Sequence, residues 1–161
     1  MKSQVHEFLV ATGNDFPEYD NLDKEYLTNK TSKIVHLLSE EVQELIDAVV
    51  DEDVTELADA VADIGVYYTQ LVLLLERAGV NYQGVTEAVC QNNSAKYTTS
   101  TGLATKWIEE AVIDGRDVYL STEEYEGTVY FCLKDKSTHK VMKPRGFEKV
   151  KLDQFVPEKF K

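Results

Sequence analysis

One long helix is predicted by the stretch Glu56-Leu-Ala-Asp59-Ala-Val-Ala-Asp63-Ile-Gly-Val-Tyr-Tyr-Thr-Gln70-Leu-Val-Leu-Leu-Leu75. At about 100° per residue, Glu56, Asp59 and Asp63 fall within roughly 60° of one another, and Gln70 continues the same line. The rest of the circumference is apolar, so we expect packing to bury most of this helix. Buried carboxylates lose hydration and repel one another, which is costly unless something compensates. We therefore expect a neighbouring group or ion to compensate the charge of the acidic stripe.

A second acidic group, Glu40-Glu41-Val-Gln-Glu44, lies on the preceding helix. Asp51-Glu52-Asp53 separates the two helices, so we expect them to be antiparallel neighbours. Spacings of three and four residues place side chains one turn apart on a shared face, where several oxygens can reach one ion. Carboxylates without His or Cys suit Mg²⁺, or alternatively Mn²⁺, and argue against zinc. The two clusters together predict a cage for divalent cations.

Each cluster also has a plainer interpretation. Glu40, Glu41 and Glu44 fit a solvated helix face, and acidic residues near a helix start are favoured by the helix dipole. The dipole explains Glu56 well, but it explains Asp63 poorly because Asp63 lies two turns inside the helix. The occurrence of both clusters side by side favours the cation cage.

Composition excludes several classes of function. The chain has 161 residues, with 29 acidic against 17 basic side chains and a net charge of −12. This balance argues against binding to nucleic acid or to an anionic membrane, although solubility alone would also explain it. Cys90 and Cys132 lack metal-ligand spacing and are expected to be reduced thiols of a cytoplasmic protein. Asp59 and Asp63 make the 56–77 helix a soluble helix and not a membrane span.

The remaining pattern predicts a mainly α fold in two parts. Further helices are expected over residues 2–11, 22–29, 33–50 and 82–96, with N-caps at Thr31-Ser32 and at Thr55 and a helix end at Gly79. Beyond these, we expect a helix over 103–113, strands over 117–121, 128–133 and 140–142, a turn at 135–139 and an irregular tail. The fold class is therefore an antiparallel helical bundle over residues 1–100, followed by a helix-plus-β-hairpin extension over residues 101–161.

The acidic clusters match a known pattern. Glu41-x-x-Glu44 followed by Glu56-x-x-Asp59 resembles the signature of the all-α nucleoside triphosphate pyrophosphohydrolases. That superfamily includes MazG-like proteins, dimeric dUTPases, dCTP pyrophosphatases and phosphoribosyl-ATP pyrophosphohydrolases. Glu40-Glu41-Val-Gln-Glu44 resembles the fuller motif of the MazG-like branch, and Asn93-Ser-Ala-Lys96-Tyr97 resembles the Asn-x-x-Lys-aromatic element that follows the core there. The resemblance covers roughly residues 30–100.

The resemblance implies a reaction and its ligands. It implies Mg²⁺-dependent hydrolysis of an NTP or dNTP to the monophosphate and pyrophosphate, in nucleotide pool sanitation or supply. It also implies that the protein is a homodimer or homotetramer. Glu41, Glu44, Glu56 and Asp59 would be the cation ligands.

Roles for the other polar residues follow from their chemistry. Either Glu40 or Glu41 would take a proton from the attacking water, and the sequence leaves that choice open. Lys96 would contact a phosphate, Asn93 a phosphate or the sugar, and Tyr97 the base, whereas the plainer interpretations are a surface lysine and a helix-end cap. Asp63 would support the ligands or face the substrate.

Two alternative functions stay open. One is a phosphoribosyl-ATP pyrophosphohydrolase, which the sequence favours less because few basic residues flank the site to hold a phosphoribosyl group. The other is a non-catalytic helical oligomer whose carboxylates bind an ion or a partner. His36 is interpreted as a packing residue and Trp107 as part of the core of the extension. Lys33 lies two turns before Glu41 and could approach a phosphate, but a surface role is favoured.

Overall fold

The computed structural model describes residues 1–161 and divides them into two compact units. The first unit contains residues 1–82 and 153–161, and the second contains residues 83–152. The five α-helices are α1 (Lys2–Ala11), α2 (Lys24–Val50), α3 (Val54–Arg77), α4 (Tyr82–Ser94) and α5 (Thr101–Ile113). The strands are β1 (Tyr97–Thr98), β2 (Val118–Tyr125), β3 (Thr128–Asp135) and β4 (Val141–Met142), and short 3-10 turns cover Tyr19–Asn21, Asp153–Phe155 and Glu158–Phe160. The predicted α-rich fold with a small antiparallel sheet is confirmed.

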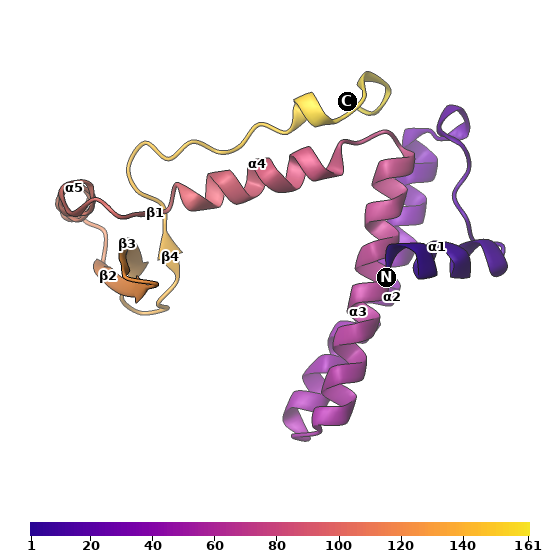
Figure 1. Ribbon diagram of the computed structural model, residues 1–161, viewed down its shortest axis with the longest axis horizontal. Coiled ribbons are helices and arrows are strands. Elements are labelled where there is room, and N and C mark those ends of the chain that lie inside the picture. Colours follow the sequence, from indigo (N-terminus) through magenta and orange to yellow (C-terminus); the bar gives the residue numbers. More distant parts are fainter. The chain divides into compact units, whose positions relative to one another are not determined.

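The first unit is built on an antiparallel pair of helices. α2 and α3 lie side by side, and α1 crosses them (Figure 1). The apolar face of α1 and those of the two long helices meet in a core of Val5, Leu9, Phe16, Ile34 and Leu74, of which Leu74 is completely buried. Val5 and Leu9 are four residues apart and therefore share one face of α1, which explains why this face packs against the two long helices.

Two helix starts differ from the prediction. α2 begins at Lys24 and runs unbroken through Thr31 and Ser32, because Asp23 caps it by accepting a hydrogen bond from the Tyr26 N–H at 2.7 Å. A Thr or Ser inside a helix costs only a few tenths of a kcal/mol, so packing of the first turns against the core overrides it. α3 is capped by Asp53 and not by Thr55, since Asp53 Oδ1 accepts from the N–H of Thr55 at 2.9 Å.

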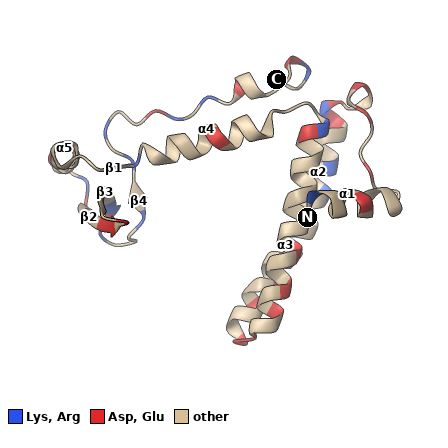
Figure 2. Cartoon of the chain, in the orientation of Figure 1, with Lys and Arg blue, Asp and Glu red and all other residues tan.

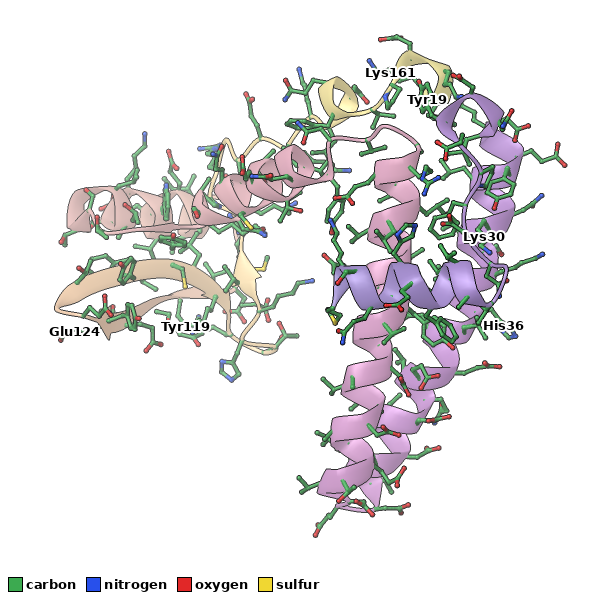
Figure 3. The ribbon with its side chains drawn as sticks, turned by 45° about the vertical axis from the view of Figure 1, so that its right-hand side comes forward. Tyr19, Lys30, His36, Tyr119, Glu124 and Lys161 are labelled. Atoms are coloured by element: carbon green, nitrogen blue, oxygen red, sulfur yellow. The ribbon has the colours of Figure 1, made fainter.

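Ion pairs and the C-terminal tail hold the first unit together. Lys2 Nζ lies 2.6 Å from Glu76 Oε1, and Arg77 lies 3.6 Å from Asp15, so α1 and its following loop are tied to the end of α3. The tail returns to the same end, where Lys159 Nζ donates to the Tyr19 carbonyl oxygen at 2.7 Å. Figure 3 shows Lys161 beside Tyr19. The last residues of the predicted extension thus belong to the first unit.

The second unit packs α5 against a small sheet. Its strand order is β1-β3-β2, with β4 also paired to β3, and all pairs are antiparallel. The core contains Trp107, Ala111, Val118 and Leu133, so the interpretation of Trp107 as a core residue is confirmed. Tyr97 pairs with Cys132 across the sheet, which ties the end of α4 to this unit. The observed division lies near residue 82, whereas the predicted division lay near residue 100.

Much of α3 is open to solvent within one chain. The helix is long and apolar enough to cross a membrane by length and composition, a test that core helices of soluble proteins also pass. Only 28% of its most apolar window is buried. Val54, Val61 and Tyr68 are each at least half exposed. The prediction that packing buries most of this helix is therefore wrong for one chain, because only α2 and part of α1 cover it.

Candidate active site

A cavity of about 650 Å³ lies in the first unit between α1, α2 and α3. Its volume falls within the range of about 300–1,000 Å³ that is usual for small-molecule sites. α2 contributes Lys30, Lys33, Ile34, Leu37 and Glu41, and α3 contributes Asp63, Val66, Tyr67 and Gln70. α1 and the following loop close the other side with Met1, Gln4, Val5, Phe8, Leu9 and Asn14.

Helical periodicity explains why these residues share one face. Lys30 lies about three turns before Glu41 at 3.6 residues per turn, so both side chains point to the same side of α2. On α3, Asp63 and Gln70 are two turns apart and both line the cavity. The acidic stripe of the sequence thus enters the cavity at Asp63 and continues to the buried amide of Gln70.

Negative charge is concentrated around Glu41. This half-buried carboxyl has a raised pKa, first because of its burial and then because of the negative charges of Glu44, Asp63, Glu40 and Asp59. Carboxylates from the two predicted clusters are therefore close enough to repel one another. In Figure 2, acidic positions (red) mark the ribbon along the part of the α2–α3 pair that extends beyond α1.

Tyr67 adds a neutral donor beside these charges. Burial raises the pKa of its hydroxyl, and the negative charges of Glu41 and Asp63 raise it further. A phenol with a raised pKa keeps its proton at neutral pH. Tyr67 can therefore donate a hydrogen bond to an anionic ligand in the cavity.

The other predicted carboxylates lie outside the cavity lining. Glu40, Glu44, Glu56 and Asp59 are exposed on α2 and α3. Glu56 occupies the first turn of α3, where its N–H donates to Asp53 Oδ1 at 3.1 Å. Among these carboxylates, the charge of Glu44 has the largest effect on Glu41.

His36 is not a packing residue, and this prediction is wrong. Its side chain is 77% exposed, and its Nε2 lies 3.7 Å from Glu40 Oε1. Figure 3 shows His36 on α2, beyond Lys30 along the helix. No other element covers this face of α2, so the ring extends into solvent beside the exposed Glu40.

The acidic residues do not form a ready-made cation site. No group of three or more His, Cys, Asp or Glu side chains converges closely enough to hold a metal ion. The donor set nevertheless fits a hard divalent cation, because it consists of carboxylate oxygens whose mutual repulsion a cation would relieve. Binding of such an ion would require these carboxylates to lie closer together than they do here.

Two lysines on α2 add positive charge to the site. Lys33, interpreted as a surface residue, lines the cavity together with Lys30. Lys30 Nζ donates to the Asn14 carbonyl oxygen at 3.4 Å and lies 5.5 Å from the centre of the Phe16 ring. Figure 3 shows Lys30 on α2. The signal in the sequence was the helical spacing from Glu41, about two turns for Lys33 and three turns for Lys30. The wall formed by α1 left no such signal.

The predicted substrate-binding motif lies in the second unit. Lys96 Nζ donates to Asn93 Oδ1 at 2.6 Å, so these two side chains lie together at the end of α4. Tyr97 donates from its hydroxyl to Ser94 Oγ at 3.1 Å and packs edge-on against Tyr130 at 5.6 Å. Asn93 and Tyr97 are exposed, which leaves them free to contact a ligand.

Comparison with known proteins identifies a family. The model of the family described as phosphoribosyl-ATP pyrophosphohydrolase matches residues 4–93, which is more than half of the chain. No curated protein and no solved structure gives a significant match. The matched segment contains both acidic clusters and every residue that lines the cavity except Met1. The resemblance to the all-α nucleoside triphosphate pyrophosphohydrolases is therefore confirmed.

Proposed function

Because this chain belongs to the phosphoribosyl-ATP pyrophosphohydrolase family, we propose that it releases pyrophosphate from a nucleoside triphosphate in a Mg²⁺-dependent reaction. Members of the family are pyrophosphohydrolases, which hydrolyse phosphoric anhydrides, so the protein is an enzyme of this class with a nucleotide substrate. The observation that carries the proposal is the presence of Glu41, Asp63 and two lysines in one cavity.

The cavity offers complementary surfaces to an NTP or dNTP. Its apolar walls, which include Phe8 and Leu37, suit a base and sugar. Lys30 and Lys33 suit phosphate oxygens, since lysine ammonium groups bind phosphates as point charges. Asn93, Lys96 and Tyr97 are proposed as further substrate-binding residues on the basis of the family motif.

The proposed cation ligands are Glu41, Glu44, Glu56 and Asp59. The position of Asp63 beside Glu41 in the cavity supports adding Asp63 to this set. Bound Mg²⁺, or Mn²⁺, would neutralise phosphate charge that an acidic protein otherwise repels.

A carboxylate must accept the proton of the attacking water. The water oxygen bonds to the phosphorus next to the sugar, the anhydride P–O bond breaks, and pyrophosphate leaves with the bonding electrons. Glu41 lines the cavity, whereas Glu40 is exposed beside His36. This difference supports Glu41 over Glu40 as the proton acceptor.

A second candidate substrate is phosphoribosyl-ATP. The family match favours it, and the sequence-based objection that basic residues are scarce near the site no longer holds. Lys30 and Lys33 would bind the additional phosphate of the phosphoribosyl group. The reaction type stays the same, because the same anhydride bond is cleaved.

A homodimer or homotetramer is proposed because apolar side chains on α2 and α3 lack a partner within the chain. Ile46, Val49 and Val61 are each more than half exposed. Helices from a second copy would cover these residues and complete the predicted helical bundle. We place the enzyme in the cytoplasm, where it would act in nucleotide pool sanitation or supply.

The proposal is tested by measuring pyrophosphate release from each common NTP and dNTP and from phosphoribosyl-ATP, with Mg²⁺ present. We expect release from at least one substrate and a loss of about 10²-fold or more in Glu41→Gln. Glu109→Gln removes an exposed charge from the second unit and should retain activity. No release from any substrate, with wild type equal to Glu41→Gln, would instead favour a non-catalytic oligomer.

A further inference from the structure

The segment after β4 brings two side chains to the predicted substrate-binding motif. Phe147 is shared by two cations, because its ring centre is 5.7 Å from Lys96 Nζ and 5.2 Å from Lys143 Nζ. Both distances are within the range of about 6 Å for cation–π attraction. Lys143 and Phe147 lie outside the residues that the family model matches.

Several contacts hold this segment in place. Asn92 Nδ2 donates to the Glu148 carbonyl oxygen at 2.8 Å, which joins the segment to α4. Arg116 Nη2 donates to the Lys143 carbonyl oxygen at 2.8 Å, and Pro144 is buried between these anchors. Figure 1 shows the chain after β4 running beside α4. The positions of Lys143 and Phe147 are therefore fixed within the second unit.

The two ammonium groups are free of acidic partners. The ion pairs of the chain include neither Lys96 nor Lys143, and the only side-chain acceptor of Lys96 is the neutral Asn93 amide. Their surroundings are also basic, since residues 134–151 contain seven basic and two acidic side chains. The whole net charge of −12 lies on the first unit, because residues 83–152 contain ten acidic and ten basic side chains. Two cations without acidic partners, at one aromatic ring of a neutral unit, attract an anion.

We propose that Lys96, Lys143 and Phe147 form an oligophosphate-binding site to which the C-terminal extension contributes Lys143 and Phe147. Two cations at one aromatic ring fit a ligand with more than one anionic group. Lys96 and Lys143 each donate to phosphate oxygens, while Phe147 orients both stems. This site rests on the proposed function because Lys96 is also a proposed substrate-binding residue. A measurement of ligand binding, without any measurement of activity, is enough to test it. The ligand is either the phosphate chain of a nucleotide or free pyrophosphate.

The test is calorimetric titration of the full chain with tripolyphosphate, in buffer freed of divalent cations by a chelating resin. Without divalent cations, the acidic first unit repels the probe and hydrolysis does not occur. We expect binding to weaken about tenfold in Lys143→Gln, as for loss of a charged hydrogen bond. Lys140→Gln is the matched control, because it removes the same charge from an exposed position in the same basic segment. Its binding should change less than twofold.

The variant Phe147→Leu tests whether the ring positions the two lysines without affecting the folding of the second unit. We expect weaker binding in this variant with an unchanged emission spectrum of Trp107, the single tryptophan, which reports the core of the second unit. Equal weakening in Lys143→Gln and Lys140→Gln would show diffuse attraction and overturn the proposal. So would the absence of tripolyphosphate binding to a wild-type enzyme that hydrolyses nucleotides, which would leave the proposed function intact.

Parallel titrations with ATP and with pyrophosphate identify the source of the ligand. Loss of ATP binding in Lys143→Gln assigns the site to the nucleotide, and loss of pyrophosphate binding alone assigns it to the free product. Binding that persists in a preparation without pyrophosphohydrolase activity would support the site and count against the proposed function.

Discussion

Asp63 on α3 and Glu41 on α2 line the same cavity, and the negative charge of Asp63 raises the pKa of the Glu41 carboxyl. The two acidic clusters of the sequence thus meet across the helix pair. Of the carboxylates on α3, only Asp63 lines this cavity, and the family motif does not include it among the cation ligands. Several measurements follow from this relationship.

Removing Asp63 should stabilise the protein that lacks divalent cations. Asp63→Asn relieves repulsion of Glu41, so its Tm in the absence of divalent cations should rise above that of wild type. Mg²⁺ should raise the Tm of wild type by mass action, and this rise should shrink in both Asp63→Asn and Asp59→Asn. Thermal unfolding with and without Mg²⁺ measures both effects. A large fall in the Tm of Asp63→Asn without Mg²⁺ would indicate a structural role for Asp63.

The pH dependence of stability should reveal the raised pKa of the Glu41 carboxyl. Its pKa in the folded protein lies above the ordinary value of 4.5, so between these two values the folded state holds a proton that the unfolded state has released. Stability therefore falls as pH rises through this window. When divalent cations are absent, the Tm of wild type should fall relative to the Tm of Glu41→Gln as the pH rises through this window. Parallel pH profiles of the two proteins would contradict this assignment.

Lys33 should contribute to substrate binding and not to stability. It lines the cavity but is exposed, and no ion pair of the chain involves it. Lys33→Gln should raise KM about tenfold, as for loss of a charged hydrogen bond to phosphate, with little change in Tm. Lys149→Gln, an exposed lysine of the second unit, is the control. An unchanged KM for every substrate would return Lys33 to the surface role that the sequence suggested.

Gly79 should be indispensable at the end of α3. Its φ is +75°, and an added Cβ would lie 3.1 Å from the Tyr19 ring and 3.3 Å from Pro157. Gly79→Ala should lower the free energy of unfolding by more than the ~1–2 kcal/mol that the left-handed conformation alone costs. Gly127→Ala is the matched control, with φ +74° and open space around the site. Urea unfolding compares the two, and equal losses would show that the contact with Tyr19 yields easily.

The exposed apolar face of the helix pair should control assembly. Ile46 is 51% exposed on α2, and a charge there would be buried in a helix–helix interface between copies. Ile46→Glu should convert an oligomer to a monomer in light scattering coupled to size-exclusion chromatography. Val112→Glu, on an exposed position of α5, should leave the assembly unchanged. A monomeric wild type would contradict the proposed dimer or tetramer.

The sequence by itself determined the long helices, the acidic clusters, the β-hairpin and the family. These features depend on residues close together in the chain, where the periods of 3.6 and 2 residues and turn signals act directly. The predicted N-caps of the two long helices differ from those observed. Asp23 and Asp53 cap them in place of Thr31 and Thr55, and the sequence pattern does not show which of these side chains accepts the capping hydrogen bond.

Only the tertiary structure decided which polar residues share a surface. The crossing of α1 over α2 and α3 made Lys33 part of a cavity, and the pairing of the two helices placed Asp63 rather than Glu56 beside Glu41. The segment after β4 likewise brought Lys143 and Phe147 to Lys96. Such contacts join residues distant in the chain, and they arise from the packing of apolar faces, which the positions of the polar residues alone do not specify.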